Sequence, residues 1–256
     1  MIRIGALISG GGTNLQAILD SCGDRSISGE VVFVGTDNPD ATGLRRAAER
    51  GIPTFVVDYG RLIRQYREDP AKCPLPPDAD METLLVDQRL LPADSPATRR
   101  RQFIASRVIA EAALLAAISS HRFDVLVLAG FMRALTPYFI DRVNPSADAP
   151  RIMNIHPALL PAFPGVDGYG DTFRYGCKVG GCTVHFVDYG EDTGPIIGQR
   201  AFAIAPGDTL DTIREKGLRQ EWRLYPECIQ LFAQDRLRIR TIAGGRRIVD
   251  ILPAQT

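Results

Sequence analysis

The chain lacks the features that mark several specialised classes of protein. No stretch approaches the roughly 20 consecutive apolar residues that a membrane-spanning helix needs. Neither sign of charge is in excess, because 30 Lys and Arg balance 30 Asp and Glu, so no overall field attracts nucleic acid or an anionic membrane. No signal peptide is visible, since Met1 leads directly into strand-like residues. We therefore expect a cytoplasmic protein that binds small molecules, and neither nucleic acid nor membrane.

Cysteine is scarce and irregularly placed. Five cysteines form no C-x-x-C pair, and His185 is the only histidine near two of them. This pattern predicts reduced thiols rather than a disulfide framework, and no metal site. The rest of the composition, with 45% hydrophobic and 23% charged residues, is that of an ordinary globular protein.

Short apolar segments alternate with helical ones along most of the chain. Strands are expected at 2–8, 30–36, 52–57, 123–129, 151–155, 182–188 and 199–204. Helices are expected at 14–22, 42–50, 102–119, 137–143 and 210–235, followed by a hairpin of 237–242 and 247–251. This alternation predicts an α/β fold with a doubly wound, mostly parallel sheet. We expect one domain, 1–256, with a C-terminal helix plus hairpin.

Residues 59–100 break this regular pattern. The segment contains six prolines and many charges, and 81–91 is its one expected helix. A segment of this length between regular elements is usually functional or mobile. We interpret it as a surface insertion, with a lid or a partner surface as the alternative.

The strongest chemical signal is an amide, an imidazole and a carboxylate placed near strand ends. Asn154 and His156 close the expected strand 151–155, and Pro157 ends it because the residue before a proline is held extended. Asp192 follows the next strand. Asn can donate to an oxyanion, His can move a proton and Asp can hold the His, so the trio suits acyl transfer. The alternative is a capped loop whose histidine bonds locally.

Residues 9–14, Ser-Gly-Gly-Gly-Thr-Asn, lie between the first strand and the first helix. Backbone N–H groups at such a helix start form an anion site. The segment matches neither the dinucleotide G-x-G-x-x-G pattern nor the P-loop, which favours a single phosphate. A tight turn without a ligand is the alternative.

A second glycine-containing segment, Gly130 to Leu135, follows a strongly apolar strand. Phe131, Met132 and Leu135 could line a pocket for a flat apolar group, although ordinary core packing is the alternative. His185, within an expected strand, is interpreted as a buried histidine in preference to a catalytic one.

Together these segments resemble the phosphoribosylglycinamide formyltransferase family. The resemblance rests on residues 8–18, 128–133, 154–161, 181–187 with 192–195, and 221–226. It covers nearly the whole chain except 60–100, and the glycine-rich opening together with Gly-Phe-Met-Arg points to the glycinamide branch of the folate formyltransferases.

The resemblance implies a fold of the formyltransferase type, a reaction and a set of site residues. The reaction is transfer of a formyl group from 10-formyltetrahydrofolate to the amine of 5-phosphoribosylglycinamide, in purine synthesis, without a metal. Asn154, His156 and Asp192 would be catalytic. The substrate would contact Gly12, Thr13, Asn14 and Glu221. The folate would contact Arg101, Met132, Arg133, Ala134, Leu135 and Asn154, with Arg99 and Arg100 as alternatives to Arg101.

The resemblance also divides the chain. Residues 1–58 and 101–150 would form the nucleotide- and folate-binding core, and 151–256 the catalytic half. The protein would be a monomer or a homodimer. Two departures from the family are the long 60–100 segment and the loop 166–171, which replaces a His-rich stretch. The alternatives are a sugar-nucleotide formyltransferase, a formyltetrahydrofolate hydrolase, or a nucleotide- or folate-binding module without catalysis.

Overall fold

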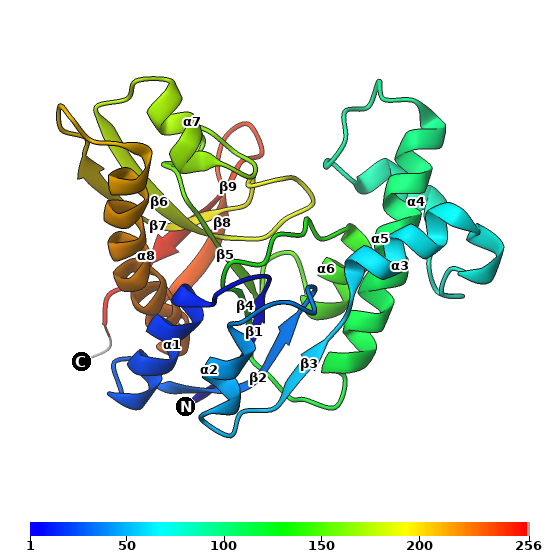
Figure 1. Ribbon diagram of the computed structural model, residues 1–256, viewed down its shortest axis with the longest axis horizontal. Coiled ribbons are helices and arrows are strands. Elements are labelled where there is room, and N and C mark those ends of the chain that lie inside the picture. The colour runs from blue at the N-terminus through cyan, green and yellow to red at the C-terminus, as the bar shows by residue number, and fades with distance from the viewer. Residues whose placement is uncertain (255–256) are drawn as a thin grey trace.

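A seven-stranded sheet forms the centre of the computed structural model, which describes residues 1–254 (Figure 1). Its strand order is β3-β2-β1-β4-β5-β6-β7. The strands are β1 (Ile2–Ile8), β2 (Gly29–Thr36), β3 (Thr54–Val56), β4 (Val125–Leu128), β5 (Ile152–His156), β6 (Val179–Phe186) and β7 (Ile196–Ala203). The first five pair in parallel, whereas β6 is antiparallel to both of its neighbours. The predicted doubly wound, mostly parallel sheet is confirmed.

Helices cover both faces of this sheet. Residues of α1 (Thr13–Gly23), α2 (Leu44–Ala48) and α8 (Leu210–Ala233) pack in one hydrophobic cluster with one face. Residues of α3 (Tyr59–Glu68), α5 (Ala97–Ile118) and α6 (Pro137–Val143) pack with the other. In β4, Val125 and Val127 join the first cluster and Leu126 joins the second. Burial on both faces explains why this strand is apolar at every position.

The chain changes direction across the sheet between β1 and β4. Successive strands lie to one side of β1 up to β3, and the next strand, β4, lies on its other side. Such a switch point opens a crevice at the carboxyl ends of the strands, where α/β proteins bind ligands. The loops that follow β1 and β4 are hydrogen-bonded to each other at this point. Ser9 N donates to Gly130 O at 3.0 Å, and Met132 N donates to Ser9 Oγ at 2.8 Å.

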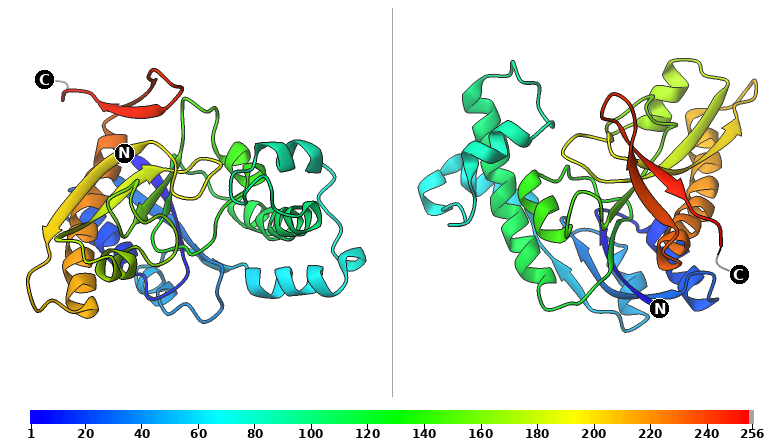
Figure 2. Two further views of the ribbon diagram at one scale, coloured as in Figure 1. Left: turned by 90° about the horizontal axis from the view of Figure 1, so that it is seen from above. Right: turned by 180° about the vertical axis from the view of Figure 1, so that it is seen from behind.

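The 59–100 segment is ordered and more helical than the sequence predicts. It contains α3, a 3₁₀ turn η1 (Pro70–Lys72), α4 (Met81–Asp87) and the start of α5, which begins at residue 97 instead of 102. Asp58 and Asp80 cap α3 and α4, and Met81 and Leu84 pack in a small cluster of their own with α5 and α6. The helices α3, α4 and α5 form one side of the molecule in all the views of Figures 1 and 2.

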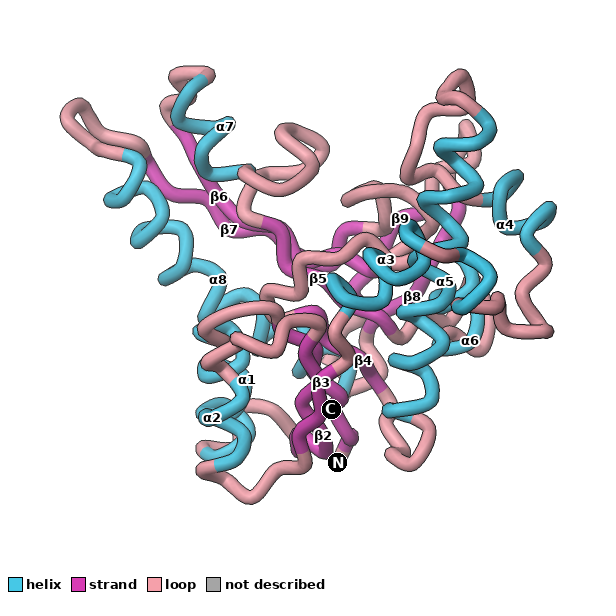
Figure 3. Tube along the Cα trace, turned by 45° about the vertical axis from the view of Figure 1, so that its right-hand side comes forward, coloured by secondary structure: helices cyan, strands magenta, loops and turns pink. Residues whose placement is uncertain are grey.

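The C-terminal half departs from the expected pattern at one element. Helix α7 (Gly168–Arg174) occurs where a loop was predicted, and a Cβ at Gly168 would lie 2.7 Å from Pro157 O. Glycine at this position therefore lets the helix approach the end of β5. The predicted hairpin is confirmed as β8 (Leu237–Thr241) and β9 (Arg247–Ile251) (Figure 3). Strand β9 contacts β7. Within residues 1–254, no helix is long and apolar enough to cross a membrane.

Candidate active site

The pairing of β5 and β6 sets the positions of the polar side chains. Side chains alternate between the faces of a strand, and Met153 and Ile155 belong to the cluster with α1 and α8, so Asn154 and His156 point to the opposite face. In the antiparallel register, Asn154 lies opposite His185 and His156 opposite Thr183. The strand pairing thus brings an amide and two imidazoles together on one face.

His156 is buried, and both of its ring nitrogens face oxygen acceptors. Nδ1 lies 3.1 Å from Asp192 Oδ2, and Nε2 lies 2.8 Å from Phe163 O. Both hydrogen bonds can form only if both nitrogens carry a proton. Burial alone lowers the pKa of His156, but the hydrogen bond and the charge of Asp192 outweigh it and raise that pKa above its ordinary value. The site therefore favours the imidazolium.

Asp192 lies in the loop between β6 and β7 with a left-handed backbone, at φ 55°. Non-glycine residues adopt this conformation uncommonly, and Asp does so more readily than most. Gly165 N donates to Asp192 Oδ2 at 2.8 Å. Burial raises the pKa of this carboxyl, but the hydrogen bond and the charge of His156, together with the bond from Gly165 N, outweigh it and hold the pKa well below its usual range.

His185 orients the amide of Asn154. Its Nδ1 lies 2.8 Å from Phe186 O and so carries the proton, which leaves Nε2 to accept from Asn154 Nδ2 at 3.3 Å. The same Nδ2 is 3.5 Å from Asp192 Oδ1, at the limit of a hydrogen bond. The amide of Asn154 is thereby held beside His156 with one N–H weakly engaged.

A cavity of about 150 Å³ adjoins this trio. It is lined by the segment after β4 and by the loop that carries Asp192. Of the predicted site residues, those that line it are Met132, Arg133, Ala134, Leu135, Asn154, His156 and Asp192. Met132 is 59% exposed, so it is a surface residue at this cavity rather than part of the core.

Arg101 lies elsewhere. It is on α5, half exposed, and its Nη1 pairs with Glu82 Oε1 at 3.2 Å inside the 59–100 segment. Neither it nor Arg99 or Arg100 lines the cavity beside Asn154.

The start of α1 forms a second part of the site. Gly12 is its N-cap with φ 68°, and no side chain caps the helix, so its first N–H groups stay available. Thr13 is exposed, whereas Asn14 is buried and donates from Nδ2 to Glu221 Oε2 at 2.6 Å. Among the described residues, the buried Asn14 Oδ1 has no partner.

Glu221, on α8, links these elements. Its Oε1 accepts from Tyr169 OH of α7 at 2.6 Å, and the carboxyl is 5% exposed. Burial raises the pKa of Glu221, although the hydrogen bonds from Asn14 and Tyr169 act in the opposite direction. The structure thus brings together Asn14 and Glu221, which the sequence assigned to one substrate.

The sequence analysis missed two polar residues of this region, Asp37 and Tyr169. Asp37, directly after β2, is 2% exposed and accepts from Ser9 Oγ and from Arg133 Nε. An acidic residue at the end of an apolar strand is the signal that could have identified it. Tyr169 lies in a segment that was interpreted as a loop, so its contact with Glu221 had no signal in the pattern.

A family model described as "Formyl transferase" matches residues 2–229. It covers the sheet, the Asn154–His156 strand, the Asp192 loop and most of α8. The fold and the site therefore define a known class of protein, and the chain belongs to the formyl transferase family.

Relatives of known name narrow this assignment. The chain is 34% identical to phosphoribosylglycinamide formyltransferase of Mycobacterium tuberculosis (strain H37Rv), over 96% of this chain and 93% of the relative. It is 33% identical to that of Escherichia coli (strain K12), over 96% of both chains. A crystal structure of glycinamide ribonucleotide transformylase 1 from Symbiobacterium toebii superposes with a TM-score of 0.72 at 39% identity, covering 99% of this chain and 95% of that one.

The chain is also 32% identical, over 90% of its length, to the trifunctional purine biosynthetic protein adenosine-3 of Drosophila melanogaster, of which it spans 14%. Within the formyl transferase family, the chain groups with the phosphoribosylglycinamide formyltransferases, which are enzymes.

Proposed function

We propose that the protein transfers the formyl group of 10-formyltetrahydrofolate to the amine of 5-phosphoribosylglycinamide. The observation that carries this proposal is the arrangement of His156, whose two nitrogens face Asp192 and Phe163 O while Asn154 lies on the same face. Protonated His156 and the amide of Asn154 supply the donors for an oxyanion, once the Nε2–H of His156 leaves Phe163 O for the substrate. Formyl transfer develops such an oxyanion on the formyl oxygen.

The phosphate of the ribonucleotide binds at the start of α1. Gly12 and Thr13 present backbone N–H groups at a helix amino terminus, where the helix dipole favours an anion. Asn14 Oδ1 is a buried acceptor with no partner in the described part of the chain, and a hydroxyl or amine of the substrate would satisfy it. Glu221 holds Asn14 in place and adds a carboxylate for the same donors.

The folate occupies the cavity beside Asn154. Leu135 and Met132 provide apolar surface for its flat ring, and Ala134 leaves room for it. Arg133 is fixed by Asp37 at 2.5 Å, so its guanidinium forms a rigid side of the cavity. Arg101 remains the proposed contact for the anionic end of the folate, with Arg99 and Arg100 as alternatives.

The reaction proceeds in two stages. The neutral amine of the ribonucleotide attacks the formyl carbon, a C–N bond forms, and the oxygen gains negative charge next to Asn154 and protonated His156. The bond from carbon to the folate nitrogen then breaks, and the proton lost by the amine reaches that nitrogen through water or His156. Asp192 keeps His156 charged, and general acid–base help of this kind contributes about 10²- to 10⁴-fold.

The remaining proposals concern the setting of this reaction. We infer a cytoplasmic enzyme that needs no metal and binds small molecules only, as a monomer or a homodimer. Sedimentation analysis distinguishes these two oligomeric states. In the proposed division of the chain, residues 1–58 and 101–150 bind the nucleotide and folate, and 151–256 carry the reacting groups.

An assay of the purified chain tests the proposed function. With 10-formyltetrahydrofolate and 5-phosphoribosylglycinamide, we expect tetrahydrofolate and the formylated ribonucleotide to form in equal amounts, as seen by mass spectrometry. Release of formate in the absence of any amine would identify a formyltetrahydrofolate hydrolase. Transfer only to the amine of a sugar nucleotide would identify a sugar-nucleotide formyltransferase. Binding of both ligands without any turnover would show a binding module.

A further inference from the structure

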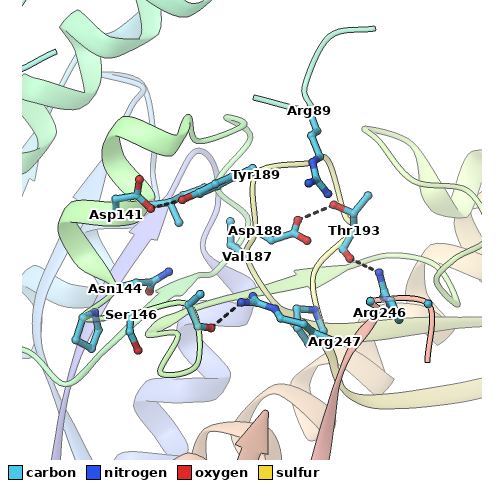
Figure 4. A pocket seen from close by; sticks show the side chains of 16 residues that line it. Arg89, Asp141, Asn144, Ser146, Val187, Asp188, Tyr189, Thr193, Arg246 and Arg247 are labelled. Atoms are coloured by element: carbon cyan, nitrogen blue, oxygen red, sulfur yellow. Dashed lines mark hydrogen bonds between the residues drawn. The ribbon is translucent and has the colours of Figure 1, made fainter. Parts of the chain in front are cut away.

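A second and larger cavity, of about 740 Å³, lies behind the loop that carries Asp192 (Figure 4). Asp188, Tyr189 and Thr193 of this loop line the larger cavity, whereas Gly190 and Asp192 line the one beside Asn154. Residues 188–194 are therefore a wall between the two cavities. Whatever holds this wall in place also holds Asp192.

The hairpin β8–β9 reaches this wall through one arginine. Arg246 immediately precedes β9, and its Nη1 donates to Thr193 O at 2.6 Å (Figure 4). Its Nη2 donates to Gly194 O at 3.3 Å. These carbonyls belong to the two residues that follow Asp192. The hairpin lies outside residues 2–229, the part that matches the family model.

The other end of the same loop is also held. Arg89 N, in the 59–100 segment, donates to Tyr189 O at 3.0 Å. Within the loop, Thr193 Oγ1 donates to Asp188 Oδ1 at 2.6 Å. Asp192 thus sits in its left-handed conformation between two anchors that come from peripheral parts of the chain.

We infer that Arg246 is a positioning residue for Asp192. Its planar guanidinium binds two successive carbonyls, which fixes the backbone conformation just after Asp192. This conformation in turn directs the Asp192 carboxylate toward His156. Arg246 acts through Asp192 and lies on the far side of the wall from the Asn154 cavity. The expected effect of Arg246 on turnover rests on the proposed formyl transfer. The expected effect of Arg246 on the His156–Asp192 contact does not depend on that function.

The neighbouring Arg247 provides a matched control. It also lines the larger cavity, but its Nη1 donates to Ala147 O at 2.8 Å, away from the Asp192 loop (Figure 4). Arg246→Ala and Arg247→Ala therefore remove the same side chain at adjacent positions of one hairpin. Arg246→Lys keeps the charge and can bond one carbonyl in place of two.

Two readouts separate positioning from general damage. In Arg246→Ala we expect kcat to fall about tenfold, which corresponds to the loss of roughly one charged hydrogen bond. Both KM values should stay within about twofold of those of the unaltered protein. Since Asp192 raises the pKa of His156, the alkaline limb of the kcat profile should move to lower pH. Arg246→Lys should recover part of both effects, and Arg247→Ala should behave like the unaltered protein.

Nuclear magnetic resonance titration of His156, one of three histidines in the chain, gives a readout that does not depend on turnover. We expect a lowered His156 pKa in Arg246→Ala and an unchanged one in Arg247→Ala, with folding checked by circular dichroism. A lowered pKa in a chain that lacks formyl transfer would contradict the proposed function but support the positioning. An unchanged His156 pKa in folded Arg246→Ala would overturn the inference, whatever its kcat.

Discussion

Asn14 and Glu221 are 207 residues apart in the sequence and are joined by a buried hydrogen bond of 2.6 Å. This contact joins α1, the first helix of the chain, to α8, its last helix. Among residues 1–254, it leaves Asn14 Oδ1 as an acceptor without a partner. The pair is therefore the structural basis of the proposed ribonucleotide site.

Glu221→Gln should weaken ribonucleotide binding. The amide can no longer accept from both Asn14 and Tyr169, so Asn14 loses its fixed orientation. We expect the ribonucleotide KM to rise about tenfold, since a hydrogen bond to a charged group contributes roughly 1.5–3 kcal/mol. The folate KM should stay unchanged. Glu215→Gln, with 67% of its side chain exposed on the same helix, is the control. Equal ribonucleotide KM values in the two variants would refute the role of Glu221.

Gly12→Ala should disturb the same site through the backbone. At φ 68° a side chain is strained by about 1–2 kcal/mol, and its Cβ would lie 3.1 Å from Gly43 Cα. The N–H groups of the α1 start would move, so calorimetric titration should show weaker ribonucleotide binding with folate binding intact. Gly23→Ala, at the other end of α1 and in open space, should bind both ligands normally. Unchanged ribonucleotide binding in Gly12→Ala would contradict the anion site.

Glu111 should make stability depend on pH. It is fully buried on α5 and accepts from Thr136 N and Oγ1, and burial raises its pKa from 4.5 to about 7. Its contribution to stability is present below pH 4.5 and is lost as the pH rises through 7. Urea unfolding measures the free energy of unfolding of Glu111→Gln relative to that of the unaltered protein. This difference should shift in favour of the variant by up to about 3 kcal/mol from pH 5 to pH 8, at 1.36 kcal/mol per pKa unit. An equal difference at both pH values would rule this out.

The 59–100 segment should contribute to stability more than to chemistry. Met81 is 6% exposed against α5, so Met81→Ala should lower the free energy of unfolding by about 2–5 kcal/mol. Val86→Ala, at 83% exposure on the same helix, should change it by less than about 0.5 kcal/mol. Both variants should keep kcat when folded. A large loss of kcat in folded Met81→Ala would mean that the segment takes part in the reaction.

The strand ends of the site could be predicted from local sequence. Pro157 stops β5 at His156, and strand alternation places Asn154 on the same face. The apolar run 125–128 likewise determines β4, because a strand buried on both faces must be apolar throughout. These positions depend on neighbours in the sequence, so the pattern contains them.

Contacts between distant segments had no such signal. The Asp192 loop folds over the β5 face because Gly194 packs where a Cβ would meet Phe186 O at 1.7 Å, and because Arg246 holds it. The charged residues 59–68 form α3 because Asp58 caps it and the helix packs on α5, which periodicity alone did not show. The resemblance, and not spacing, linked Asn14 to Glu221.

The pH dependence of formyl transfer by Asp192→Asn tests the central claim most directly. The claim is that Asp192 keeps His156 protonated beside Asn154. An amide in place of the carboxylate removes the negative charge, so at saturating substrates kcat should fall by about 10² or more, with the alkaline limb at lower pH and both KM values little changed. Turnover close to that of the unaltered protein, with an unmoved alkaline limb, would contradict the claim.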